Sequence, residues 1–138
     1  MNEKTIENEI MAFLDMKGLF PMKLENQGTF DPIKKVYRGN RSRFKRKGMS
    51  DILFFYMGKA VFIEVKTPKT FSYIQKHFEK LESGFVQSQS RITDQIRFQK
   101  EIEKRGNFAY FCDSIERAEK ILDHISYKLI DEKELKIP

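Results

Sequence analysis

The sequence has little of what several classes of protein require. It contains one cysteine, Cys112, so a fold held together by internal disulfides is excluded. Four prolines and seven glycines among 138 residues exclude a collagen-like or low-complexity chain. The longest apolar run, residues 52–57, is too short for a membrane span or a signal-peptide core. We therefore expect a cytoplasmic protein that does not bind membranes.

The apolar content is sufficient for a folded core. Hydrophobic residues make up 40% of the chain and include 13 phenylalanines and five tyrosines. A chain of this length suits one compact domain, so we expect residues 1–138 to form a single domain. Cys112 ends the apolar run 108–112, which predicts a buried strand thiol rather than a reactive one.

Positive charge is concentrated in one segment, residues 34–47, although the whole chain carries only +6. No acidic residue lies between Asp31 and Asp51. The segment contains eight basic side chains: Lys34, Lys35, Arg38, Arg41, Arg43, Lys45, Arg46 and Lys47. Such a run predicts a basic loop that binds DNA phosphates in a salt-dependent manner. The alternative is a solvated loop without a ligand.

The apolar periodicity predicts a mixed α/β fold with a central sheet flanked by helices. The expected elements are a helix over 3–17, an extended stretch over 20–25, strands over 51–57 and 60–66, helices over 71–81 and 92–104, a strand over 108–112, and a helix over 115–125. Gly58 and Lys59 separate the first two strands as a tight turn, which predicts a hairpin. Asp113 or Ser114 is expected to cap the last helix, leaving a charged C-terminal tail.

The first helix carries acidic residues beside its apolar face. At about 100° per residue, Glu3 and Glu7 project toward the side of Ile10 and Leu14, whereas Glu9 points away. Glu3 also suits a helix start, where a carboxylate complements the macrodipole. Glu7 is therefore the preferred candidate, and Glu3 remains the alternative.

The second strand of the hairpin ends in charged residues. Its alternation places Glu64 and Lys66 on one face of an otherwise apolar strand, where buried charges are costly unless each has a partner or a metal. Antiparallel pairing would bring Asp51, at the start of one strand, beside Glu64 at the end of the other. Two carboxylates and the Val65 carbonyl would suit Mg²⁺, and Lys66 would act on the attacking water and on phosphate charge.

These residues resemble the PD-(D/E)XK nuclease superfamily, and from Glu3 to about Leu122 the chain looks like a stand-alone VRR-NUC domain, the virus-type replication-repair nuclease branch. The matching pieces are Ile6-Glu7, Leu14, Gly18, Lys23, Gly28 with Thr29-Phe30-Asp31, Gly48-Met49-Ser50-Asp51-Ile52, Ile63-Glu64-Val65-Lys66, Gln95, and Gly106 with the last strand. The resemblance implies a restriction-endonuclease-like core. It also implies that Glu7, Asp51, Glu64, Lys66 and Gln95 form the catalytic set, with Glu7, Asp51, Glu64 and the Val65 carbonyl as metal ligands.

Gln95 matches the active-site glutamine of that family. A helix-surface amide is the alternative, but Gln95 lies on the inward stripe with Ile92 and Phe98, where a buried amide needs a partner. Residues 71–91 depart from the family as a helical insertion that would cover DNA, form a dimer surface, or gate the site. His77 and His124 belong to no recognisable metal spacing and are expected at the surface.

The resemblance implies an Mg²⁺-dependent endonuclease, with Mn²⁺ as a substitute. It further implies branched DNA such as a four-way (Holliday) junction as substrate, a homodimer as the assembly, and a phage or prophage setting. Two alternatives remain at this stage: a non-catalytic DNA-binding or assembly module with the same fold, and a sequence-specific restriction-type nuclease.

Overall fold

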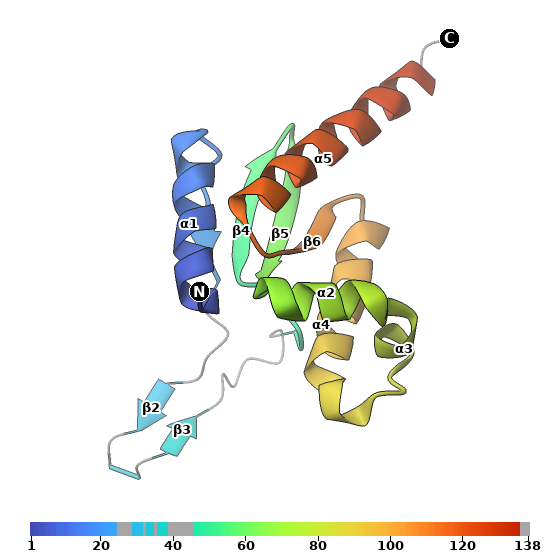
Figure 1. Cartoon of the computed structure of the whole chain (residues 1–138). Helices are drawn as coiled ribbons and strands as arrows, with labels where there is room; N and C mark the ends of the chain where they lie inside the picture. The colour runs from blue at the N-terminus through green and yellow to red at the C-terminus, as the bar shows by residue number, and fades with distance from the viewer. Residues whose placement is uncertain (25–28, 32, 35, 39–45, 136–138) are drawn as a thin grey trace.

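The structure is a computed structural model that describes residues 1–24, 29–31, 33–34, 36–38 and 46–135. Its elements in chain order are α1 (Glu3–Met16), β1 (Met22–Lys23), β2 (Thr29–Asp31), β3 (Val36–Arg38), β4 (Ile52–Tyr56), β5 (Lys59–Val65), α2 (Pro68–Lys76), α3 (Phe78–Ser83), the 3-10 turn η1 (Gln87–Gln89), α4 (Ser90–Lys104), β6 (Phe108–Cys112) and α5 (Ile115–Leu135). Figure 1 shows their arrangement.

The centre of the molecule is a four-stranded sheet in the order β1-β4-β5-β6. β4 is antiparallel to both β1 and β5, while β6 is parallel to β5, so the sheet is mixed. Helices flank it (Figure 1). The predicted mixed α/β class, with a central sheet between helices, is confirmed. The strands β2 and β3 form a separate antiparallel pair.

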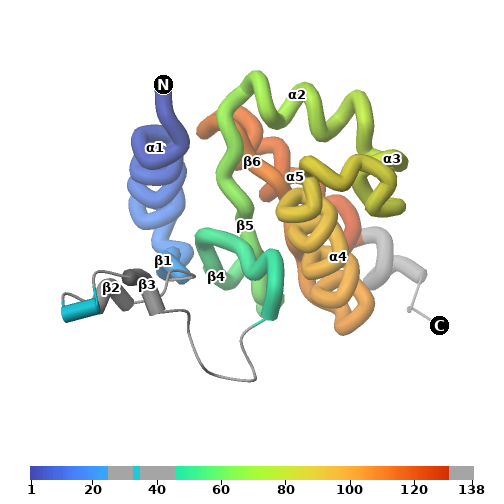
Figure 2. The backbone as a smooth tube through the Cα atoms, turned by 90° about the horizontal axis from the view of Figure 1, so that it is seen from below, coloured from blue at the N-terminus to red at the C-terminus, as the bar shows by residue number. Residues whose placement is uncertain are grey.

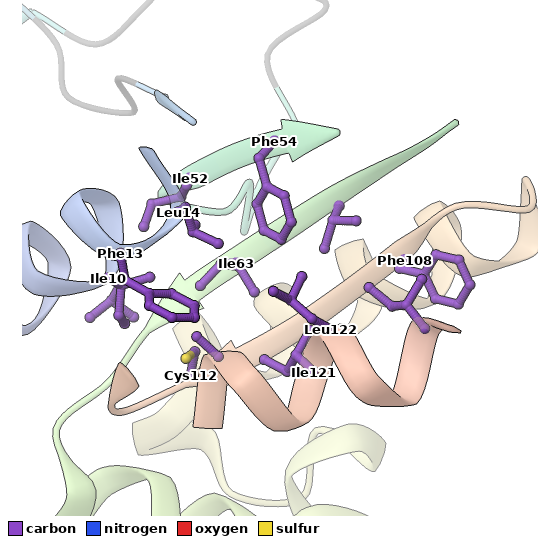
Figure 3. Packing of buried hydrophobic residues seen from close by; sticks show 14 of the residues in the cluster. Ile10, Phe13, Leu14, Ile52, Phe54, Ile63, Phe108, Cys112, Ile121 and Leu122 are labelled. Atoms are coloured by element: carbon purple, nitrogen blue, oxygen red, sulfur yellow. The ribbon is translucent and has the colours of Figure 1, made fainter. Parts of the chain in front are cut away.

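One face of the sheet packs against α1 and α5. Val61, Ile63 and Val65 alternate along β5 and are almost fully buried on this face. Figure 3 shows side chains from α1, β4, β6 and α5 meeting over the sheet, with Ile63 of β5 among them. The apolar alternation of β5 therefore contributes one row of side chains to the main core.

The other face of β5 packs against α4, which lies across the sheet from α1 (Figure 2). The Phe62 ring of β5 meets the Phe98 ring of α4 edge to face, with centroids 5.5 Å apart. Residues Glu64 and Lys66 share this face with Phe62 because side chains alternate along the strand. Glu64 and Lys66, at the end of β5, therefore lie on the face of the sheet that packs against α4.

The strand β6 is an outer strand of the sheet, because β5 is its only neighbour among the described strands. A hollow of about 490 Å³ lies beside it. The hollow is lined from α2, α3, α4 and α5 by residues that include Phe71, Gln99 and Arg117. This edge is therefore surrounded by helices without being filled.

Two predicted boundaries differ from the structure. The hairpin turn consists of Met57 and Gly58, both with positive φ, so that Tyr56 pairs with Lys59. The expected turn was one residue too late, because a two-residue turn with two positive φ angles closes directly on Lys59. The last helix continues to Leu135 rather than ending near residue 125, so the expected charged tail is helical to that point. The sequence has no helix-breaking residue in this stretch.

The segment 71–91 is also less regular than expected. The helix α2 already begins at Pro68, with the Thr67 side chain accepting a hydrogen bond from the Thr70 amide as an N-cap. His77 then separates α2 from α3, and η1 leads into α4.

No helix in the described part of the chain combines the length and apolarity needed to cross a membrane.

Candidate active site

The hairpin brings Asp51 and Glu64 together at one edge of the sheet. Asp51 immediately precedes β4, and its amide donates to the carbonyl of Ile63 at 3.0 Å. Its carboxylate Oδ2 accepts a hydrogen bond of 2.9 Å from the amide of Val65. The Asp51 side chain is therefore held beside the last two residues of β5, next to the carboxyl group of Glu64.

Glu64 is only 3% exposed, and its two oxygens differ. Oε1 accepts a hydrogen bond of 2.5 Å from Nε2 of Gln95 on α4. The same oxygen lies 3.8 Å from Nζ of Lys66, which is itself 6% exposed. Oε2 is buried and has no hydrogen-bond donor within the described residues.

The protonation of Glu64 reflects this setting. Burial, followed by the negative charge of Asp51, raises the pKa of Glu64 from its usual 4.5 to about 8. The positive charges of Lys66 and Arg91 act in the opposite direction. Since two ionised carboxylates can only accept hydrogen bonds, Asp51 and Glu64 need either a shared proton or a cation between them.

The loop before Asp51 packs tightly on α4, next to Gln95. Gly48 has φ +73°, and a Cβ at this position would collide with the backbone of Asp94 and Gln95. Only glycine allows so close an approach in this conformation. Gly48 thus fixes the spacing between the loop that carries Asp51 and the helix that carries Gln95.

Glu7 reaches the same edge of the sheet without joining the carboxylate pair. Its Oε1 forms an ion pair of 3.5 Å with Nζ of Lys23, and Lys23 pairs with Ile52. Glu3 is exposed, which favours Glu7 as the helix-one acid. Glu9 is partly buried as well, so the expected contrast in burial between Glu7 and Glu9 is absent.

The donor set fits a magnesium ion with two protein carboxylates. In the described part of the chain, no group of three or more His, Cys, Asp or Glu residues is placed to hold a metal. Mg²⁺ retains several waters and commonly takes only one or two carboxylates together with substrate phosphates. The unsatisfied Oε2 of Glu64, next to Asp51, is the kind of oxygen that such an ion uses. Val65 follows Glu64 and donates its amide to Asp51, and its carbonyl remains a predicted ligand.

The two histidines are placed elsewhere. His124 is exposed, and its Nδ1 lies 2.9 Å from the hydroxyl of Tyr110. His77 is half-buried and its ring contacts that of Tyr73. Cys112 is buried in β6 as predicted, and burial raises the pKa of its thiol to about 11.

The basic loop is described only in part. Lys34, Arg46 and Lys47 are exposed, and Arg38 belongs to β3, so a short strand replaces part of the expected loop. The remaining predicted DNA-binding residues lie outside the described residues: Lys35, Arg41, Arg43 and Lys45. The predicted role of the loop in DNA binding stays a prediction.

Sequence reasoning missed one charged neighbour of the site. Arg91 lies in the first turn of α4, and its charge lowers the pKa of Glu64. Its spacing of four residues before Gln95 is the signal that would have found it, because residues four apart share a helix face.

Comparisons with known proteins add no family to this geometry. No protein-family model matches the chain, and no curated protein matches it either. The interpretation of the site therefore rests on its own residues.

Proposed function

We propose that this protein is a magnesium-dependent endonuclease that hydrolyses phosphodiester bonds in DNA. The observation that carries the proposal is the pair formed by Asp51 and the buried Glu64, in which Oε2 of Glu64 is unsatisfied within the described residues while Oε1 lies 3.8 Å from Nζ of the buried Lys66. A cation would satisfy this pair, and substrate phosphates would complete its ligands. The sheet is proposed to be a restriction-endonuclease-like core of the VRR-NUC type.

In this proposal, bound Mg²⁺ supplies charge neutralisation at the phosphate and a more acidic water. Gln95 holds the carboxylate of Glu64 in one orientation through its hydrogen bond. Lys66 positions the attacking water and balances negative charge on the phosphate. The water oxygen bonds to phosphorus and gives up a proton to solvent, the bond from phosphorus to the leaving sugar oxygen breaks, and that oxygen takes up a proton from solvent.

Branched DNA, such as a four-way junction, is the proposed substrate class. The support is the resemblance of the sequence pieces around Asp51, Glu64 and Gln95 to stand-alone VRR-NUC domains. The same resemblance supports a homodimer as the working assembly, since two-fold symmetry would supply two similarly oriented sites.

The test is cleavage of four-way junctions, flaps, linear duplex and single strands with Mg²⁺, Mn²⁺ or EDTA. The wild-type protein should cut branched DNA with either metal and not with EDTA. Asp51→Asn and Glu64→Gln should each lower the rate at least about 100-fold, because each removes a ligand charge without changing side-chain size. Lys66→Ala should be comparably slow and still bind metal.

Matched controls are Glu119→Gln and Lys128→Ala, which make the same chemical changes at exposed positions of α5. Both should cut at the wild-type rate. Wild-type protein that binds DNA but cuts no substrate with either metal would instead indicate a non-catalytic DNA-binding module.

A further inference from the structure

Two contacts define how the helix α4 packs along the strand β5. Phe98 packs on Phe62, and Gln95, three residues earlier in α4, donates to Glu64, two residues later in β5. The two elements therefore run in opposite directions. Three residues of the helix advance about 4.5 Å, and two residues of the strand advance about 6.6 Å. A third contact in this series would lie beyond Glu64, at the end of β5.

Arg91 is the residue of α4 at that third position. It lies one helical turn before Gln95, on the same face of α4, and so projects over the end of β5 where Lys66 lies. Its side chain is exposed, in contrast to the buried Lys66. In the described part of the chain, none of the ion pairs involves Arg91.

We propose that Arg91 binds the scissile phosphate, with its guanidinium on the non-bridging oxygens. This inference rests on the proposed nuclease function and adds a residue that the sequence did not suggest. A planar guanidinium can donate two parallel hydrogen bonds to a phosphate, which an ammonium group cannot do.

In this proposal the two basic side chains, Lys66 and Arg91, have different roles. Lys66 is buried against Glu64 and is suited to the water side of the reaction. Arg91 faces solvent, where a DNA backbone can approach it. The positive charge of Arg91 also acts on the carboxyl group of Glu64, which places it within electrostatic reach of the site.

The experiment compares Arg91→Ala, Arg91→Lys and Arg97→Ala in single-turnover cleavage and in DNA binding with Ca²⁺ in place of Mg²⁺. Arg97 is the matched control because it is an exposed arginine of the same helix, about 120° around the axis, with its guanidinium near Gly84. Arg91→Ala should slow cleavage about 100-fold while DNA affinity changes less than about threefold. Arg91→Lys should recover only part of the rate, and free guanidinium ion should partly rescue Arg91→Ala.

The results distinguish an error in the role of Arg91 from an error in the nuclease proposal. If Arg91→Ala cuts within about threefold of wild type, or if Arg97→Ala loses as much, the role of Arg91 is wrong and the nuclease proposal stands. A loss of DNA affinity equal to the loss of rate would reduce Arg91 to a general DNA contact and overturn its role at the scissile phosphate. Wild-type protein without Mg²⁺-dependent cleavage would overturn the nuclease proposal itself and the role of Arg91 with it.

Discussion

The carboxyl group of Glu64 lies among charges of both signs in a buried position. Asp51 and burial favour its protonated form, whereas Lys66 and Arg91 favour the ionised form. The first two effects are larger, and the pKa rises to about 8. At neutral pH the metal-free protein therefore keeps a proton on this pair, and a divalent cation would have to displace it.

This pKa makes the stability of the metal-free protein depend on pH. Glu64 ionises near pH 4.5 in the unfolded chain and near pH 8 in the folded protein. Between these values the folded state binds more protons, so the free energy of unfolding should fall as the pH rises from 4.5 to 8 and then level off. Urea unfolding in EDTA across this range measures the effect.

Glu64→Gln removes the titrating group and should flatten this part of the pH profile. Glu119→Gln, which changes an exposed acid on α5, should retain the wild-type slope. Added Mg²⁺ should stabilise the wild-type protein more at pH 8 than at pH 6, because fewer protons compete with it. Identical slopes for wild type and Glu64→Gln would show that Glu64 keeps an ordinary pKa.

At the scale of elements, the site depends on one contact between a loop and a helix. The residues before β4 cross α4 at Asp94 and Gln95, where Gly48 leaves no space for a side chain. The loop delivers Asp51 and the helix delivers Gln95, and both act on Glu64. A small displacement at Gly48 would therefore separate the two partners of Glu64 from each other.

Gly48→Ala tests this contact. The change should lower the free energy of unfolding by about 2 kcal/mol or more, since it combines a strained positive φ with a backbone collision. It should also slow the proposed cleavage reaction by at least about tenfold through displacement of Asp51 and Gln95. Urea unfolding and the junction-cleavage assay report the two effects separately.

Gly106→Ala is the control, because Gly106 has φ +84° and open space around its Cβ position. It should cost only about 1 kcal/mol for the strained φ and leave the cleavage rate unchanged. If Gly48→Ala behaves as Gly106→Ala does in both assays, the close approach to α4 has no role in forming the site.

The elements that sequence reasoning predicted well are those with local causes. The hairpin of β4 and β5 follows from alternating apolar residues and a two-residue turn, and its pairing alone brings Asp51 to Glu64. The inward orientation of Gln95 follows from its helical spacing relative to Phe98. The strand Phe108–Cys112 was likewise visible as an apolar run bounded by Gly106.

The elements that were missed depend on contacts between distant parts of the chain. The interruption at His77 carries no glycine or proline, so nothing local marks it. The extension of α5 past residue 125 follows a continuing apolar spacing, with Leu129 packed against the main core. The spacing of Arg91 four residues before Gln95 places both on one face of α4, but only the packing of α4 along β5 shows that this face lies at the site.

At the scale of the whole molecule, the proposed nuclease needs a surface that attracts DNA. The basic segment 34–47 enters the chain shortly before Asp51, so it is tethered to the edge of the sheet that carries the site. Neutralising Lys34, Lys35, Arg41, Arg43, Arg46 and Lys47 should weaken DNA binding and flatten its salt dependence. Each lost phosphate contact should reduce the slope of log K against log salt by about 0.9.

The control for this variant neutralises six other basic residues, Lys59, Lys80, Lys100, Lys104, Lys120 and Lys128. It changes the net charge equally and should leave most of the salt slope in place. Metal binding should be unchanged in both variants. An unaltered salt slope after neutralising the segment 34–47 would remove it from the DNA interface.

The outer position of β6 has a consequence for the handling of this protein. Its residues, Phe-Ala-Tyr-Phe-Cys, combine high strand propensity with no charge and no proline, which is the composition of segments that template intermolecular strand pairing. Residues of α2, α3, α4 and α5 line the hollow beside this edge. Loosening these helices should therefore expose an aggregation-prone strand edge even at a net charge of +6.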